Sequence, residues 1–348
     1  MEAETPTPHW FIARGRHIGY LVDGDNGTVQ GTMTLSMFTP AMQPHLSQDR
    51  IYAYGSYYSR TYYGDRTDLV VGYDAKTLAP VVEIEIPAKS AGIGHSGMIG
   101  LMGDRFIGVW NITPAMSVSI VDLQTEQFVG EISTPGCAAV YPMGEGFMMP
   151  CGDGTLQYIR LDADGREVSR IRSDAFFKID EDPVYDYAVP TEDGWLMVSF
   201  DGLVYEVTLD GAALKISEPW SLFAGEDEDS EWRIGGYQPF AYNAPNRMLV
   251  ALVHEGGGQE TFEDPGSEVW AFSLDSKRRG YRLKLQGKDD EAPVLGSGLQ
   301  LTQDATPLLM VAPDEDKALR IYDGRTGAHQ RTLKEMGVRL LQNLDLGP

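Results

Sequence analysis

The chain has 348 residues, with 51 Asp and Glu against 28 Lys and Arg, which gives a formal net charge of −23. This acidity excludes a general nucleic-acid binder, because no surplus of basic residues is present to neutralise phosphates, and it argues against docking on an anionic membrane surface. The sequence contains no run of 18 apolar residues, so no transmembrane helix is predicted. The start of the chain shows no signal peptide, which fits either a cytosolic protein or a mature form with an added Met.

An apolar run that ends in Asp recurs seven times along the chain. The Asp residues that end the runs are Asp23, Asp74, Asp122, Asp162, Asp210, Asp275 and Asp323. The gaps between successive Asp residues are 51, 48, 40, 48, 65 and 48 residues. A repeat of this length is typical of propellers and other repeat architectures, and it has to be recognised before single elements are assigned.

A turn and a second apolar run follow each of these Asp residues. The last turn reads Asp323-Gly324-Arg325-Thr326-Gly327, and the second turn leads into the alternating run 81–86. Asp can accept hydrogen bonds from the backbone two residues on, and Gly tolerates a positive φ. Period-2 alternation on both sides of a tight turn predicts a β-hairpin, here the outer pair of strands in a four-stranded blade.

Further strand-like runs lie between the hairpins, at 105–110, 194–200, 247–253 and 308–312. Seven units of about four strands each are typical of a propeller. We therefore predict an all-β fold, a seven-bladed β-propeller of four-stranded blades over residues 15–348, preceded by an N-terminal arm over residues 1–14. A pair of β-sandwiches is the alternative. The gap of 65 residues predicts an insertion around Glu226–Glu231 or Glu255–Gly266.

The sequence contains no self-sufficient catalytic motif. It lacks a Gly-x-Ser-x-Gly elbow, a His-Glu-x-x-His helix and a P-loop. Gly92–Gly97 matches Gly-x-Gly-x-x-Gly, but without the βαβ context that a dinucleotide site needs. The six His residues are scattered, and none lies at ligand spacing from another. We therefore predict no catalytic, cofactor-binding or metal-binding residue in this chain, and we infer that any chemistry is completed by another chain.

The two cysteines, Cys137 and Cys151, flank two short strand-like runs joined by a Gly-containing turn. Opposite ends of one hairpin can bring two Cα atoms to about 5.5 Å, which suits a disulfide. We favour a disulfide, with two buried thiols as the alternative. A disulfide would place the chain in an oxidising compartment such as the bacterial periplasm.

Four stretches carry a resemblance to a known family. They are Tyr58-Ser59-Arg60 with Gly64–Asp68 and Tyr73–Leu78, Thr134–Cys137 with Tyr141-Pro142 and Cys151–Leu156, Trp232–Gln238 with Ala241-Tyr242, and Asp316–Asp323. In this order they resemble the heavy (large) subunit of the tryptophan tryptophylquinone amine dehydrogenases, methylamine dehydrogenase and aromatic amine dehydrogenase. The resemblance extends from about Gly19 to Leu346.

The resemblance implies a seven-bladed propeller, an intrachain disulfide between Cys137 and Cys151, and a periplasmic α2β2 heterotetramer of heavy and light chains. It implies that the light chain carries both the tryptophan tryptophylquinone cofactor and the catalytic Asp base. The assembly would oxidise a primary amine to an aldehyde and ammonia, and a small copper protein or a cytochrome c would accept the electrons. A periplasmic location implies that a signal peptide is removed or replaced in this sequence.

One functional position, Phe38, can be carried over from the family, and we expect Met37 beside it to line the substrate channel as well. The family has a Phe in a Phe-x-Pro context that reaches into the channel, and the matching residue here is Phe38 in Ser36-Met37-Phe38-Thr39-Pro40. Ser36 and Met37 replace the small Gly pair that precedes this Phe in methylamine dehydrogenase. The alternative role of Phe38 is packing on the propeller face. Residues 91–100 are small and Gly-rich where the methylamine enzyme is bulkier, which suggests a roomier channel and a larger amine.

Two other functions compete with the amine dehydrogenase subunit. A self-sufficient propeller hydrolase, such as a lactonase, would need a metal held on the propeller axis by carboxylate or amide side chains. A non-enzymatic binding propeller would share the scaffold but would oxidise no amine in any assembly.

Overall fold

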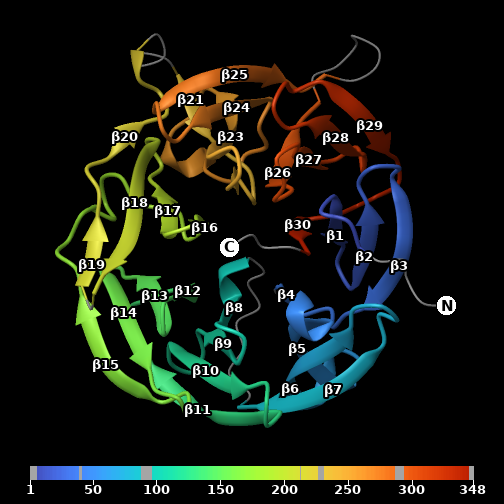
Figure 1. Cartoon of the computed structure of the whole chain (residues 1–348), viewed down its shortest axis with the longest axis vertical. Coiled ribbons are helices and arrows are strands. Elements are labelled where there is room, and N and C mark those ends of the chain that lie inside the picture. The colour runs from blue at the N-terminus through green and yellow to red at the C-terminus, as the bar shows by residue number, and fades with distance from the viewer. Residues whose placement is uncertain are drawn as a thin grey trace. The chain divides into compact units, whose positions relative to one another are not determined.

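A computed structural model describes residues 6–38, 41–87, 96–211, 213–225, 231–286 and 294–344. These residues form seven antiparallel sheets of four or five strands, so the fold is the predicted all-β, seven-bladed β-propeller (Figure 1). The remaining regular structure in the described residues is three short 3-10 turns, η1 (Leu46–Gln48), η2 (Ser96–Met98) and η4 (Gln259–Thr261). No helix in these ranges is long and apolar enough to cross a membrane.

The first four sheets run in chain order, apart from one strand that comes from the far end of the chain. Their strands are β1 (Trp10–Arg14), β2 (Ile18–Asp23), β3 (Thr28–Thr34) and β30 (Leu340–Asn343); β4 (Met42–His45), β5 (Arg50–Arg60), β6 (Tyr63–Asp74) and β7 (Pro80–Ile86); β8 (Ile99–Met102), β9 (Phe106–Asn111), β10 (Ser117–Asp122) and β11 (Gln127–Ser133); and β12 (Tyr141–Met143), β13 (Gly146–Pro150), β14 (Leu156–Leu161) and β15 (Glu167–Arg172).

The other three sheets include the two with an extra strand. Their strands are β16 (Val189–Pro190), β17 (Gly194–Val198), β18 (Leu203–Asp210), β19 (Ala213–Ile216) and β20 (Trp220–Ser221); β21 (Trp232–Ile234), β22 (Phe240–Asn243), β23 (Met248–Glu255), β24 (Glu268–Ser273) and β25 (Arg278–Lys284); and β26 (Gly296–Leu301), β27 (Leu308–Pro313), β28 (Leu319–Asp323) and β29 (His329–Leu333). The extra strands, with a long connection at 256–267 that contains η4, account for the 65-residue gap. Residues 226–230 of the first expected insertion lie outside the described residues.

The described chain separates into two compact units. The sheets β4–β7, β8–β11 and β12–β15 lie within the first, Met33–Asp186, which also includes Val207–Ile216. The second unit contains Glu4–Thr32, Tyr187–Glu206 and Ser217–Pro348.

Both ends of the chain contribute to one sheet of the second unit. The strand order is β3-β2-β1-β30, and Phe11 of β1 pairs with Asn343 of β30 (Figure 1). Residues 10–14 are therefore part of a blade rather than of the predicted arm. Their pairing with β30 spans almost the whole sequence, so local periodicity could not show it.

Burial follows the position of a strand within its sheet. All six residues of β9 and of β10 are buried, whereas the outer strand β11 is mostly exposed or partly buried. The buried side chains of these strands, such as Ile107, Val109 and Ile120, join a core cluster with Phe147 and Ile159 of the next sheet. Strands covered on both faces read as continuous apolar runs, and half-exposed strands alternate.

Most of the repeating Asp residues cap the turns between the outer strands, as predicted. Asp74 accepts hydrogen bonds from the backbone N–H groups of Lys76 and Thr77 at 3.1 and 2.8 Å. Asp323 does the same for Arg325 and Thr326 at 3.0 and 2.9 Å. The bonds from Thr77 hold the pKa of Asp74 below its ordinary value, because they stabilise the ionised carboxylate.

Candidate functional site

Met37 and Phe38 lie in the segment that joins β3 to β4, and both side chains are partly buried. The Phe38 ring packs edge-on against Tyr58 of β5, with ring centroids 5.5 Å apart and an interplanar angle of 67°. Such a T-shaped pair places the positive edge of one ring on the negative face of the other. Thr39 and Pro40, the rest of the family motif, lie outside the described residues.

Ser36 anchors this segment to β5. Its hydroxyl donates a short hydrogen bond to the carbonyl oxygen of Ser56, and its Oγ accepts the N–H of Phe38 at 3.1 Å. Ser36 is 7% exposed, so these bonds are shielded from water. Ser36 therefore fixes the backbone that carries Phe38.

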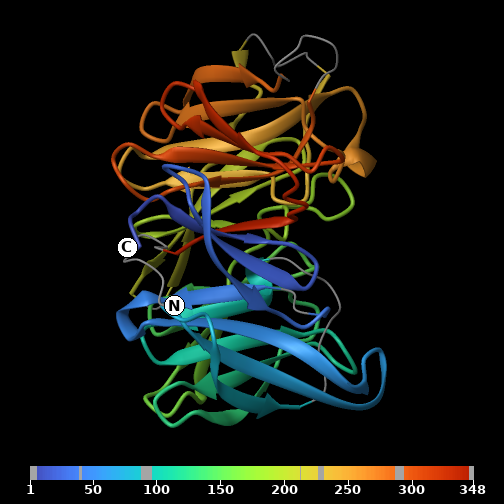
Figure 2. The same cartoon turned by 90° about the vertical axis from the view of Figure 1, so that its right-hand side faces the viewer.

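The strands β5 and β6 form a long hairpin that extends beyond their neighbours. Pairing continues through Ser56–Asp68 and Tyr58–Arg66, whereas β4 reaches only as far as Ala53. The light-blue hairpin projects from its sheet in Figure 2. A two-stranded ribbon of this kind needs side-chain contacts to hold its shape, because it lacks flanking strands.

An ion pair between Arg66 and the buried Asp68 holds the hairpin next to Phe38. Arg66 donates two hydrogen bonds to the Asp68 carboxylate, at 3.0 and 2.8 Å, and a third to Ser56 Oγ at 3.3 Å. The Asp68 side chain is 0% exposed. The guanidinium of Arg66 also lies 6.0 Å from the centre of the Tyr58 ring. Arg66 and Asp68 thus position Tyr58, and through it Phe38.

The tip of this hairpin contains Ser59 and Gly64, two further residues of the stretch that carries the family resemblance. Ser59 Oγ accepts the backbone N–H of Asp65 at 3.0 Å. Gly64 has φ +104°, and a Cβ at this position would lie 2.4 Å from Ser59 Oγ. Glycine is therefore required by both the backbone conformation and the available space.

Cys137 and Cys151 form a disulfide, as the sequence favoured. They lie before β12 and after β13, at opposite ends of one hairpin, and their Cα atoms are 4.0 Å apart, closer than the expected separation. Both residues are buried. The disulfide links the ends of a hairpin in the first unit.

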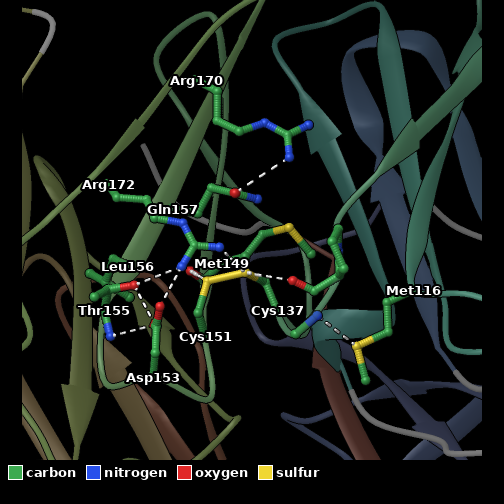
Figure 3. Close-up of a disulfide and its surroundings, with 12 residues drawn as sticks. Met116, Cys137, Met149, Cys151, Asp153, Thr155, Leu156, Gln157, Arg170 and Arg172 are labelled. Atoms are coloured by element: carbon green, nitrogen blue, oxygen red, sulfur yellow. Dashed lines mark hydrogen bonds and ion pairs between the residues drawn. A yellow bond between two sulfur atoms is a disulfide. The ribbon is translucent and has the colours of Figure 1, made fainter.

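Figure 3 shows Arg172 beside the disulfide. Its guanidinium donates to Asp153 at 2.6 Å and lies 3.6 Å from Cys137 Sγ. Asp153 also accepts the Thr155 hydroxyl at 2.6 Å. Hydrogen bonds from Thr155 lower the pKa of Asp153, so the carboxylate that orients Arg172 is ionised at neutral pH.

Structural partners are present for His9, His45 and His254. His9 lies between two carboxylates, with Nδ1 2.6 Å from Asp25 and Nε2 3.2 Å from Asp304. His45 bonds the carbonyl oxygen of Asp104, and His254 that of Thr261. In the part of the chain that the structure describes, no group of three or more His, Cys, Asp or Glu residues is arranged to hold a metal ion.

Comparisons with known proteins agree on one family. A family model described as methylamine dehydrogenase heavy chain (MADH) matches residues 7–341. The chain is 25% identical to the methylamine dehydrogenase heavy chain of Methylorubrum extorquens, over 91% of this chain and 76% of that protein. It is 26% identical to the methylamine dehydrogenase heavy chain of Paracoccus versutus, over 91% and 73% respectively.

Solved structures are similar in fold. A functionally unknown protein from Desulfotomaculum acetoxidans superposes with a TM-score of 0.63 at 12% identity, covering 97% of this chain and 100% of that one. At this identity the likeness shows the propeller fold alone.

Proposed function

The chain belongs to the methylamine dehydrogenase heavy chain family, and from this premise we propose that it is the large, cofactor-free subunit of an amine dehydrogenase that oxidises a primary amine to an aldehyde and ammonia. The observation that carries the proposal is the family match over residues 7–341, nearly the whole described chain. The same match favours a dehydrogenase subunit over a propeller hydrolase or a binding propeller.

A small light subunit would complete the enzyme as an α2β2 heterotetramer. It would carry tryptophan tryptophylquinone and the catalytic Asp, and the quinone would supply the two-electron oxidation of the amine. The residues around Phe38 are consistent with a cofactor and a catalytic base that lie on the light chain. They present an aromatic pair, Phe38 and Tyr58, next to the Arg66–Asp68 ion pair.

The contribution of this chain is shape and exclusion of water. Phe38 and Met37 would wall the substrate channel where the light chain meets the propeller. The bonds of Ser36 and the Tyr58 contact make this wall rigid. A fixed wall discriminates amines by size, and a difference of one methylene in such a pocket is worth about 1–3 kcal/mol.

Electrons would leave the assembly to a small copper protein or a cytochrome c. The net charge of −23 would attract a basic acceptor over a long range, and added salt would weaken that attraction. The disulfide supports a periplasmic location, because disulfides persist in oxidising compartments.

The proposal is tested by producing the chain with and without the light chain encoded beside it, in a host able to mature the quinone. We expect reduction of an artificial acceptor dye that depends on a primary amine only when both chains are present. The light chain alone and the heavy chain alone serve as controls. Hydrolysis of a lactone by the heavy chain alone, without amine oxidation by the pair, would replace the proposal with the hydrolase function.

A further inference from the structure

Arg14, the last residue of β1, is a buried cation without a counter-charge. It is only 8% exposed, and its Nε has no hydrogen-bond partner. No ion pair joins it to a carboxylate of the described residues. Arg320, which is 7% exposed, shows the usual arrangement, since it donates to Asp316 and to the carbonyl oxygen of Ala318.

The neighbours of Arg14 include Gly19 and Leu340 on the adjacent strands, the Tyr237 side chain and the positive charge of Arg339. Gly19 lies directly across from it on β2. On the other side the backbone N–H of Arg339 donates to the Arg14 carbonyl at 2.8 Å, and the Arg339 side chain is exposed. Arg16, in the turn that follows β1, is also exposed. This corner of the second unit is basic in a chain whose net charge is −23.

The electrostatic state of Arg14 agrees with the geometry. Burial lowers its pKa most, the Tyr237 side chain opposes this effect, and the positive charge of Arg339 adds a smaller lowering. A buried guanidinium remains protonated and is stabilised only by an anion or a full set of acceptors. The fold therefore retains an unfavourable charge that a bound anion would relieve.

We propose that Arg14 is the buried cation of a carboxylate-binding site, with Arg339 at its rim. A planar carboxylate suits the guanidinium because two parallel N–H groups can bind its two oxygens, which a spherical anion cannot accept in the same way. The same chemistry is offered by a small free carboxylate and by an Asp or Glu side chain of an assembled subunit. The two arms of the experiment distinguish these sources.

The first arm uses the purified full chain alone and does not depend on the proposed function. Sodium acetate replaces sodium chloride at constant ionic strength, and thermal unfolding and calorimetric titration are recorded. We expect acetate to bind saturably. At an acetate concentration ten times Kd, it should raise Tm by about 1–3 °C. Arg14→Met should abolish this rise without lowering Tm in chloride, whereas Arg16→Met, a control at an exposed Arg two residues away, should keep it.

The second arm rests on the proposed function and uses the assembled enzyme. If the carboxylate belongs to the light chain, Arg14→Met should weaken assembly at least tenfold, Arg16→Met should not, and acetate should compete with assembly of the native chain. Arg14→Lys keeps the charge but loses the paired donors, so it should give an intermediate effect in whichever arm responds.

Saturable acetate binding that Arg14→Met removes supports a free-ligand site, and an assembly defect specific to Arg14 supports a subunit carboxylate. The proposal is overturned if the native chain shows no acetate binding and both Arg14 variants assemble normally. A loss of stability in Arg14→Met that acetate does not influence in the native chain would also overturn it, because Arg14 would then be satisfied within the fold.

Discussion

Phe38 is held by contacts on two sides, its backbone by Ser36 and its ring by Tyr58. Removing the ring should widen the channel without disturbing this support. In the assembled enzyme, Phe38→Ala should shift the ratio of kcat/KM for a larger amine over methylamine by about tenfold or more in favour of the larger amine. Phe262→Ala, which truncates an exposed Phe in the connection between β23 and β24, should leave the ratio unchanged. An unchanged ratio for Phe38→Ala would remove the channel role.

The Arg66–Asp68 pair gives a second residue-scale prediction. Arg66→Ala would leave the fully buried Asp68 carboxylate without its bidentate partner, and we expect a loss of about 2–4 kcal/mol in the free energy of unfolding. Lys178→Ala breaks an exposed pair with Glu181 and should cost less than about 0.5 kcal/mol. Denaturant unfolding of both variants makes the comparison, and equal small losses would mean that Arg66 does not secure the hairpin.

His9 gives a pH-dependent prediction. Partial burial alone would lower its pKa, but the bonds and charges of Asp25 and Asp304 outweigh burial and raise it. A raised pKa contributes stability that is present below the ordinary His value of about 6.5 and is lost as the pH rises through the folded-state value. His9→Gln should therefore cost about 1 kcal/mol at pH 6 and clearly less at pH 9, as measured by unfolding at both pH values. An equal cost at both would show that the charge on His9 is not involved.

At the scale of elements, the disulfide closes the hairpin β12–β13. Replacing both cysteines with Ser should lower the free energy of unfolding by about 3 kcal/mol, because the open loop gains entropy in the unfolded chain. Thermal unfolding of the native chain with and without reductant checks the same quantity. A variant with Met116→Ala, which removes the contact of that sulfur with the Gly136 N–H beside the disulfide, is the matched control. No change on reduction would mean that the hairpin is closed by packing alone.

The outer hairpins and some inner strands could be predicted from sequence, since an alternating run, a capping Asp and a turn are local signals. The predicted runs correspond to β9, β17, β23 and β27. The short strands β16 and β20 have two residues each, too few for any period to show. Strand β1 was assigned to an arm because its partner β30 is more than 300 residues away in the sequence.

The candidate site shows the same division between local and distant information. Phe38 was found by resemblance, but nothing in its motif indicates Tyr58, Ser56 or the Arg66–Asp68 pair as its supports. These contacts join segments that are remote in the sequence. Arg14 carries no sequence signal, since an Arg at a strand end is ordinary until its burial is known.

At the scale of the whole molecule, the central claim is that this propeller works only as part of a quinone enzyme. The most direct test is the absorption spectrum of the assembly captured through a tag on this chain from its native host, during titration with a primary amine. The account predicts a second, small chain and a visible quinone band that bleaches in proportion to the amine added. A single colourless chain whose spectrum does not respond to amines would contradict it.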